Sequence, residues 1–397
     1  SNPPNRVVYA STAPDTSYME YVQERVTTLH NLRETTPAAP TDRTAVVVPM
    51  TEREYAGLGA ERVLSELEAV DPQRVVVPLG APAEKVAAFR DWLADFELSL
   101  DVLWCNGPRL SDLLAEHGLN GSGGKGRDVW LALGQVLDAE FVVCHDADTK
   151  TYDRSYVPRL LFPLAHGHEF SKGYYARVEN GRLYGRLFRL FYAPLVQALS
   201  NDTPDAEVLQ YLSAFRYALA GEFAATGDLV SRMRIQRSWG LEVGTLGEAF
   251  GATGFAGSAQ VDLGAYKHDH RAVSGPTGLS EMSHAVGDAL CRVVSEHGID
   301  PDYATLADRY RTAADRLIDQ YAVDAAYNDL AYDPTDEREQ VDSYAATISE
   351  PGDDTRLPAW REAPINPDAV ANAAAADLQA ATTDTTPVDH SVGNRLN

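Results

Sequence analysis

The sequence has little positive charge. Only five of its 397 residues are lysine, and 34 Lys and Arg stand against 58 Asp and Glu, which gives a formal net charge of −24. A surface with this excess of negative charge repels nucleic acid and anionic membranes, so neither is an expected partner. The acidic, lysine-poor composition also predicts a protein kept soluble in high salt, and therefore a halophilic host.

Long hydrophobic runs, cysteine clusters and targeting signals are also missing. No interior run of about 18 apolar residues occurs, which argues against a membrane span. The first residues lack the basic-then-apolar order of a signal peptide. Cys105, Cys144 and Cys291 have no CxxC spacing, so neither a disulfide framework nor a cysteine zinc site is indicated. We expect a reduced, cytoplasmic protein.

Short β-branched runs alternate with amphipathic helical patterns in the first half of the chain. The predicted strands cover 44–49, 74–78, 100–104 and 139–144, and the predicted helices cover 60–70, 82–96, 109–117 and 127–137. This alternation predicts right-handed βαβ crossovers and an α/β fold with a doubly wound, mostly parallel sheet. In such sheets ligands bind beyond the carboxyl ends of the strands.

Composition divides the whole chain into four predicted regions. These are a leader with an N-terminal helix in 1–43, a catalytic domain in 44–275, a helical extension in 276–332 and an acidic Ala-, Thr- and Pro-rich tail in 333–397. The N-terminal helix is based on the helical spacing of Met19, Val22, Val26 and Leu29. We expect about the last 30 residues to be disordered. The helical extension offers either a homodimer surface or packing against the catalytic domain.

Two acidic residues directly follow the predicted strand 139–144. Asp146 and Asp148, spaced i and i+2, can both face the crevice as the chain turns outward. Carboxylate oxygens suit Mg²⁺ or Mn²⁺, which keeps open positions for substrate phosphates. The alternative is an Asx-type turn that closes the strand. The position after an apolar strand favours the metal site.

A glycine-rich loop, 121–127, carries Lys125 ahead of a predicted helix. Glycines let backbone N–H groups approach an anion, and a helix N-terminus adds a favourable dipole. The loop is not a P-loop, because Gly126 breaks the GxxxxGK[ST] spacing. The alternative is a solvated loop, but a lysine between glycines in a lysine-poor chain favours phosphate binding.

Six short motifs occur in order along the chain. They lie at 48–54, 124–126, 146–148, 221–223, 240–244 and 261–264, the last followed by His268. Together they resemble the GT-A glycosyltransferases, in particular the glucosyl-3-phosphoglycerate synthases and their mannosyl relatives, over about residues 44–300. The resemblance implies a metal-dependent, retaining transfer of glucose from UDP- or GDP-glucose to 3-phosphoglycerate or a similar small anionic acceptor, toward the compatible solute glucosylglycerate.

The resemblance also implies roles on the donor side. Pro49 and Glu52 would hold the base and ribose of the nucleotide, and Lys125 would contact the diphosphate. The implied metal ligands are Asp148, Asp146 (directly or through water) and His268. An imidazole from another segment can complete a site otherwise made of carboxylate, phosphate and water.

On the acceptor side, the resemblance places Glu242 near the acceptor and the anomeric carbon, in a positioning or proton-handling role, with Glu222 beside it. The residues alone leave a second interpretation of Glu242, an acid at a helix start stabilised by the dipole. Arg186 falls where the family has an arginine that grips phosphoglycerate. Lys172 lies in 170–177, a segment similar to the family's acceptor-supporting strand.

The chain departs from the family pattern at two places. Phe188 stands where the family has a small hydroxyl residue, and the strand starting at 74 ends Pro78-Leu79-Gly80 without the usual nucleotide-contacting Asp. The alternatives are therefore a mannosyltransferase or another GT-A transferase with a different acceptor. A non-catalytic, sugar-nucleotide-binding regulatory protein is an alternative of another class. A nucleotidyltransferase is disfavoured. That class has a Gly-rich first loop that contains arginine, and the Gly-Lys-Gly arrangement does not match it.

Donor and acceptor are both anions, although the chain carries a large negative charge. A local group of cations would resolve this conflict. We expect Lys125, Arg127, Lys172, Arg177 and Arg186 to form such a positive island together with the metal.

Overall fold

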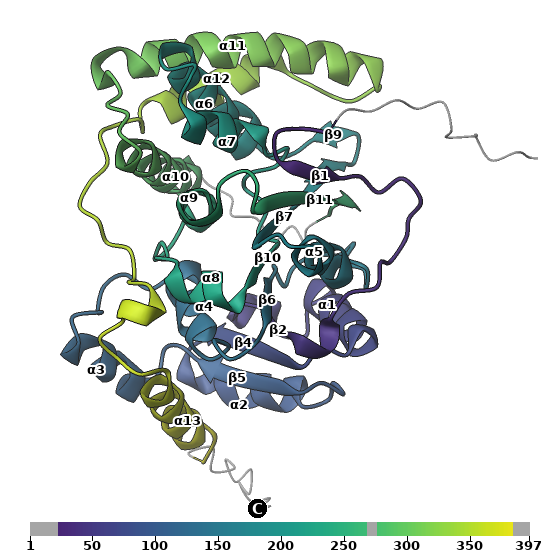
Figure 1. Ribbon diagram of the computed structural model, residues 1–397, viewed down its shortest axis with the longest axis vertical. Helices are drawn as coiled ribbons and strands as arrows, with labels where there is room; N and C mark the ends of the chain where they lie inside the picture. Colours follow the sequence, from purple (N-terminus) through teal and green to yellow (C-terminus); the bar gives the residue numbers. More distant parts are fainter. Residues whose placement is uncertain (1–22, 268–275, 384–397) are drawn as a thin grey trace, which may run out of the picture.

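A mixed sheet of nine strands forms the centre of the protein in a computed structural model, which describes residues 23–267 and 276–383 (Figure 1). Its strands are β1 (Thr27–Leu29), β2 (Thr44–Val47), β3 (Met50–Thr51), β4 (Arg74–Gly80), β5 (Leu100–Trp104), β6 (Phe141–Cys144), β7 (Phe170–Ala176), β10 (Phe223–Thr226) and β11 (Ser258–Ala265). Their order is β1-β11-β7-β10-β6-β2-β4-β3, with β5 beside β4. A small hairpin pairs β8 (Val178–Glu179) with β9 (Arg182–Leu183).

The strand directions confirm the predicted mostly parallel α/β sheet. β2, β4, β5 and β6 run parallel to one another, as do β1, β7 and β11. β10 is antiparallel to both of its neighbours, β6 and β7, so these two strands run in the same direction. The carboxyl ends of β2, β6, β7 and β11 and the start of β10 therefore lie along one edge of the sheet.

Helices cover both faces of the sheet and extend beyond one end of it. They are α1 (Leu58–Val70), α2 (Ala83–Leu93), α3 (Pro108–Glu116), α4 (Lys125–Gly134), α5 (Tyr156–Ala165), α6 (Ala193–Asp202), α7 (Glu207–Ala214), α8 (Gly227–Arg232), α9 (Leu241–Thr253), α10 (Pro276–Glu296), α11 (Tyr303–Tyr327), α12 (Pro334–Ala345) and α13 (Pro367–Thr383). In Figure 1, α1 and α5 lie to the right of the sheet, α4, α8 and α9 to its left, and α6, α7, α11 and α12 beyond β1. No helix within the described ranges combines the length and the apolar character of a membrane span.

Two hydrophobic cores follow from the alternation of side chains along the strands. In the strand segment that begins with β2, Ala45 and Val47 belong to the core that includes α4, whereas Val46 and Val48 belong to the core that includes α1 and α5. All four side chains are buried. A strand covered on both faces needs apolar side chains in both directions, which explains the uninterrupted apolar run.

An extended segment, residues 346–366, connects α12 to α13 along one side of the molecule (Figure 1). The backbone groups of its Leu357 exchange two hydrogen bonds with those of Ile235, 2.8 and 3.0 Å long. Its Trp360 indole stacks on Trp130 of α4, with ring centroids 4.2 Å apart. These contacts attach the C-terminal region to α4 and to the segment that follows α8.

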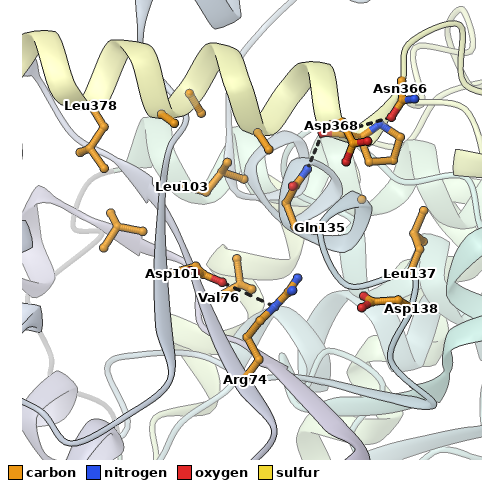
Figure 2. Close-up of a pocket in the computed structure, with 16 residues that line it drawn as sticks. Arg74, Val76, Asp101, Leu103, Gln135, Leu137, Asp138, Asn366, Asp368 and Leu378 are labelled. Carbon is orange, nitrogen blue, oxygen red and sulfur yellow. Dashed lines mark hydrogen bonds and ion pairs between the residues drawn. The ribbon is translucent and has the colours of Figure 1, made fainter.

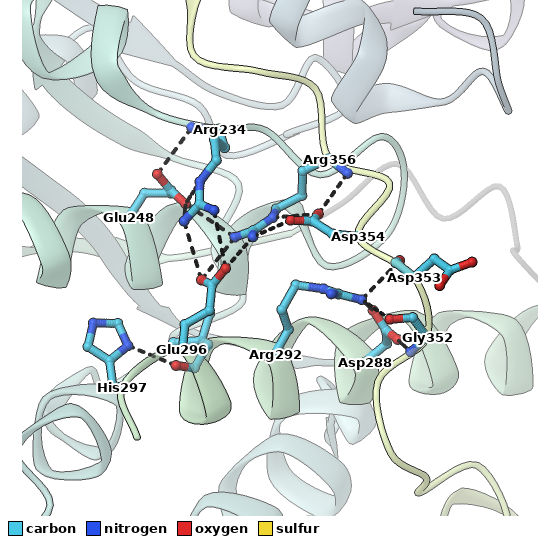
Figure 3. Close-up of polar contacts among 11 residues, drawn as sticks. Arg234, Glu248, Asp288, Arg292, Glu296, His297, Gly352, Asp353, Asp354 and Arg356 are labelled. Atoms are coloured by element: carbon cyan, nitrogen blue, oxygen red, sulfur yellow. Dashed lines mark hydrogen bonds and ion pairs between the residues drawn. The ribbon is translucent and has the colours of Figure 1, made fainter. Parts of the chain in front are cut away.

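A cluster of ion pairs holds the middle of this segment (Figure 3). The Arg356 side chain, only 3% exposed, pairs with Glu248 and Glu296 and, at 2.6 Å, with Asp354. Arg234 joins the same two glutamates. The hydrogen bond from Arg356 is the main cause that lowers the pKa of Asp354 to about 2.

The last described helix, α13, packs against β5 and against the helices α2 and α3. The buried carboxylate of Asp377 accepts hydrogen bonds from the backbone N–H groups of Arg109 and Leu110 at the start of α3. Gln135 Nε2 donates to the Pro367 carbonyl oxygen over 3.1 Å. A polar-rimmed cavity of about 560 Å³ lies between α13 and strands β4 and β5 (Figure 2).

The predicted N-terminal helix is wrong over its described part. Residues 27–29 form β1, which pairs with β11. Thr28 is buried there, and its hydroxyl accepts a hydrogen bond from Gln260 Nε2 at 2.9 Å. Pairing with an open sheet edge has outweighed the helical spacing of the apolar residues. Residues 1–22 of the predicted leader region, 1–43, lie outside the described residues.

The predicted disorder of about the last 30 residues is wrong up to Thr383, where α13 ends. α12 and α13 are helices that the composition of the tail did not predict. The Asp333 side chain caps α12 by accepting from two backbone N–H groups, and Val370 and Ala374 of α13 are buried in the main core. The division of the chain into four regions stays a prediction, and residues 384–397 lie outside the described part.

Candidate active site

Five of the predicted site residues line one cavity at the edge where the parallel strands end. Pro49 and Glu52 follow β2, Asp146 and Asp148 follow β6, and Lys125 begins α4. The cavity has a volume of about 800 Å³. Its wall also includes Met50, Thr51, Glu54, Asn106, Arg127, Arg177, Trp239 and Met282. The size suits a nucleotide-sized ligand.

Lys125 links two of the predicted carboxylates. Its Nζ lies 2.5 Å from Asp146 Oδ1 and 3.2 Å from Glu242 Oε1. Burial alone would lower the pKa of Lys125, but the negative charges of Asp146 and Glu242 outweigh burial and raise this pKa well above its usual value. Lys125 is therefore a cation held between the proposed metal ligand and the proposed acceptor-side acid.

Close packing at Gly126 fixes the start of α4. A Cβ at this position would lie only 1.7 Å from the Gln236 carbonyl oxygen, so only glycine fits. The backbone N–H of Arg127 donates to the Arg237 carbonyl oxygen at 2.8 Å. The glycine after Lys125 thus has a packing role, in addition to the anion approach that the sequence predicts.

Two glycines also let other segments approach the acidic loop closely. A Cβ on Gly221 would lie 2.6 Å from the Asp146 carboxylate, and a Cβ on Gly59 of α1 would lie 2.8 Å from the Asp148 backbone. His145, between the strand and the acids, is fully buried, and burial lowers its pKa to about 4. His145 is therefore a neutral core residue, and the two aspartates provide the charge of this loop.

Glu242 lies in the first turn of α9, as the sequence predicts. Gly240 precedes the helix with a φ of +91°, in the left-handed region that favours glycine. The Glu242 side chain is 17% exposed and reaches Lys125. The positive end of the helix dipole stabilises the negative charge of a first-turn acid. Position and partner therefore agree with both the structural and the acceptor-side interpretation of Glu242.

A buried hydrogen-bond chain surrounds Glu222, the residue before β10. Tyr266 Oη donates to Glu222 Oε1 over 2.7 Å, and Thr149 Oγ1 donates to Tyr266 Oη over 2.7 Å. Tyr175 stacks on Tyr266, with ring centroids 3.8 Å apart. Tyr266 was not among the predicted site residues. Its place directly after β11, at the same sheet edge as the acids, is the signal that could have indicated it.

Lys172 lies in β7 behind the cavity wall and is not among the residues that line the cavity. The side chain is 1% exposed, and its Nζ has no hydrogen-bond partner among the described residues. Burial is the main cause that lowers the pKa of Lys172 to about 8, although Glu242 and Glu222 act in the opposite direction. An acceptor contact by Lys172 stays a prediction.

The structure does not bring Arg186 to the cavity. Its Nε lies 2.9 Å from Glu337 Oε1, and its Nη2 pairs with Asp336. Both acids belong to α12, which lies in the predicted acidic tail, 333–397. Arg189 also pairs with Glu337, at 3.0 Å. These arginines thus attach the tail to the π-helical segment Leu187–Tyr192.

The third predicted metal ligand, His268, lies outside the described residues. Within residues 23–267 and 276–383, no three His, Cys, Asp or Glu side chains are grouped as a metal site. Asp146 and Asp148 line the same cavity and form the described part of the predicted metal site.

Comparison with known proteins decides the family. No family model matches the chain. A glucosyl-3-phosphoglycerate synthase from Methanococcoides burtonii is 33% identical over 385 residues, covering 87% of this chain and 94% of the relative. The chain belongs to the glucosyl-3-phosphoglycerate synthase family. A synthase of this name from Persephonella marina is 35% identical over 76% of this chain and 79% of its own. The chain is therefore a glycosyltransferase.

Solved structures confirm the predicted GT-A fold. Glucosyl-3-phosphoglycerate synthase from Mycobacterium tuberculosis, solved with Mn²⁺, UDP-glucose and phosphoglyceric acid, superposes with a TM-score of 0.51. It is 22% identical, over 70% of this chain and 89% of its own. Mannosyl-3-phosphoglycerate synthase from Rubrobacter xylanophilus has a TM-score of 0.50 at 23% identity, over 65% of this chain and 77% of its own.

Proposed function

We propose that this chain transfers glucose from UDP-glucose or GDP-glucose to 3-phosphoglycerate or a closely similar small anionic acceptor. The observation that carries the proposal is the cavity that Glu52, Asp148 and Lys125 line together with Asp146. In it Lys125 pairs with Asp146, and its ammonium group also reaches Glu242. The name of the relatives that match most of the chain supports glucosyl transfer to phosphoglycerate.

Mg²⁺ or Mn²⁺ fits the acidic part of the cavity. Asp146 and Asp148 offer the hard oxygen ligands that these ions prefer, and the Lys125 ammonium group 2.5 Å from Asp146 marks a position that suits a cation. We assign the metal to Asp148, Asp146 and His268. When bound, the ion neutralises the diphosphate that leaves the sugar. The synthase from M. tuberculosis was solved with Mn²⁺, which supports this assignment.

On the donor side, we assign Pro49 and Glu52 to the nucleoside and Lys125 to the diphosphate. In the structure, Lys125 pairs with Asp146 and Glu242. If Asp146 holds the proposed metal, Lys125 would give up this carboxylate, and its ammonium group could contact phosphate oxygens. Lys125 would then move its charge from the protein's acids to the leaving group.

On the acceptor side, we assign Glu242 to positioning the acceptor hydroxyl or handling its proton. The configuration at the anomeric carbon is retained if the acceptor hydroxyl attacks from the same face that the diphosphate leaves. This requires the site to hold the hydroxyl and the diphosphate together on that face. We keep Glu222 and Lys172 as supports of the acceptor end. Arg186 has to leave Glu337 and Asp336 of α12 before it can bind an acceptor.

A panel of donors tests the proposal. The purified protein, with Mg²⁺ in molar KCl, is given UDP-glucose, GDP-glucose or GDP-mannose together with 3-phosphoglycerate. We expect release of nucleoside diphosphate with a glucose donor. Release with GDP-mannose alone would establish the mannosyltransferase alternative, and binding of donors without turnover would establish the regulatory one.

The metal assignment needs its own variant. Asp148→Ala should abolish turnover with the best donor, whereas Asp138→Ala, an exposed acid before β6, should keep it. Unchanged turnover in Asp148→Ala would refute the metal mechanism.

We propose a halophilic host and a cytoplasmic location from the composition of the chain. A glucosylglycerate precursor made in the cytoplasm of a halophilic host suits the net charge of −24. We also propose a homodimer through the helical extension, since α11 exposes Val323 and Tyr327.

A further inference from the structure

An anionic acceptor needs a cation whose charge the protein's own acids do not already neutralise. Of the five cations expected to form a positive island, Arg186 is paired with acids of α12, and Arg127 is paired with Asp128 at 2.7 Å. Lys125 lies between two carboxylates, and Lys172 does not line the cavity. Arg177 differs from all four.

Arg177 lines the cavity and forms no ion pair within the described part of the chain. Its Nη1 donates to Tyr217 Oη over 3.1 Å, and its buried Nε has no hydrogen-bond partner there. Burial alone would lower the pKa of Arg177, but the neighbouring tyrosines Tyr217, Tyr175 and Tyr266 raise it, so the guanidinium stays charged. A charged fork at a cavity, with donors to spare, is a binding site for an acidic group.

Packing holds the partner of Arg177 in place. The ring of Tyr217 contacts those of Tyr175 and Phe188, each with centroids 4.9 Å apart. Tyr175 in turn stacks on Tyr266, whose hydroxyl bonds to Glu222. The guanidinium is thus oriented by a rigid aromatic wall that continues to the buried acid beside the proposed metal site.

The strand order shows which end of the cavity Arg177 occupies. β7, which Arg177 follows, is separated from β6 by β10, and β2 lies on the other side of β6. Asp146 and Asp148 after β6 therefore lie between the nucleotide segment that starts at Pro49 and Arg177. A donor with its nucleoside at Pro49 and its diphosphate at the aspartates directs its sugar toward Arg177.

We propose that Arg177 binds the acidic group, phosphate or carboxylate, of the acceptor and so determines acceptor specificity, with the Tyr217 hydroxyl holding the guanidinium. The inference rests on the proposed function, because it assumes an anionic acceptor next to the donor sugar. It assigns the acceptor contact to Arg177 in place of Arg186, whose charge α12 already neutralises.

Variants of Arg177 test the inference. Arg177→Gln should raise the acceptor KM by about 10- to 100-fold, the range expected for a lost charged hydrogen bond. The Kd of 3-phosphoglycerate should rise by the same factor. This Kd is measured by calorimetry in the presence of Mg²⁺ and nucleoside diphosphate. Arg177→Lys should recover part of the loss. The KM of the sugar nucleotide should stay within about twofold in both variants. Arg182→Gln, an exposed arginine in the adjoining hairpin, is the matched control and should behave as wild type.

Different acceptors identify the group that is bound. If Arg177 binds phosphate, the loss in Arg177→Gln persists with glycerol 3-phosphate and disappears with glycerate; if it binds carboxylate, the pattern reverses. Either pattern supports the inference. A wild-type acceptor KM and Kd in Arg177→Gln, or equal losses for donor and acceptor, would overturn it. Absence of transfer by the wild type would instead count against the proposed function, and the binding measurement would still decide the role of Arg177.

Discussion

Adding one methyl group at Gly221 should displace the proposed metal ligand Asp146 while leaving the rest of the protein in place. The nearest atoms that the new Cβ would meet are the Asp146 carboxylate oxygens, at 2.6 and 2.7 Å. Ordinary contact begins near 3.4 Å, so the carboxylate has to move by about 0.8 Å. Because only a side-chain end is in the way, the Gly221→Ala protein should fold.

The displacement predicts a large loss of activity. Reactive groups have to be held within about 0.5 Å of their productive geometry, and a misplacement of about 1 Å can cost about 100-fold in rate. We therefore expect kcat with the best donor and 3-phosphoglycerate to fall by about 100-fold, which corresponds to about 2.7 kcal/mol of transition-state stabilisation. The Mg²⁺ concentration for half-maximal activity should rise, since Asp146 is one of the proposed ligands.

The assay measures kcat and Mg²⁺ dependence for Gly221→Ala beside Gly251→Ala. The control changes a glycine inside α9, the helix that carries Glu242, where the added Cβ would meet only His297 Nε2 at 3.8 Å. Thermal unfolding should be close to wild type for both proteins. Wild-type kcat and wild-type Mg²⁺ dependence in Gly221→Ala would refute the reasoning that Asp146 has to occupy its present position.

Three further predictions concern stability. Arg356→Ala should lower the free energy of unfolding by about 3 kcal/mol, because three acids lose the buried cation that they share. Chemical denaturation measures this loss. The folded fraction should keep its transfer activity. Arg356 lowers the pKa of Asp354 to about 2 and, although burial opposes this, also lowers the pKa of Glu296. The stability from these two acids is thus present above about pH 4 and lost as pH falls toward 2. Acid titration of Arg356→Ala should show a smaller loss, which comes from Glu296 because Arg234 still lowers its pKa. Gly126→Ala should prevent folding or cost more than about 3 kcal/mol by circular dichroism, because its Cβ would overlap the Gln236 carbonyl; a stable, active variant would contradict the packing of α4.

Local pattern was enough to predict the strands and helices of the first half of the chain. The apolar runs at β2 and β4 have the composition of strands covered on both faces, and their structure agrees to within a few residues. The C-terminal helices could not be predicted in this way. α13 depends on distant contacts, such as Asp377 with the start of α3, and β1 depends on the free edge of β11. Neither partner can be read from the neighbouring sequence.

Sequence motifs predicted which proposed donor-side residues lie together, but not the partners of the proposed acceptor-side residues. Asp146, Asp148 and Lys125 belong to segments that directly follow strands or begin a helix, so topology brings them together. Arg186 lies in a π-helical region whose charge partners come from α12, about 150 residues away. The contact of Tyr266 with Glu222 likewise depends on the pairing of three strands. These long-range contacts decide which cations are already paired with the protein's own acids.

The most direct test of the account is the identification of the product by mass spectrometry and NMR, with Mg²⁺, 3-phosphoglycerate and each glucose donor. We predict glucosyl-3-phosphoglycerate with an α-linked glucose, formed in equal amount with nucleoside diphosphate. A product with a β-linked glucose would contradict retention. The absence of a glucosylated acceptor with both donors, under salt conditions in which the protein is folded, would contradict the central claim.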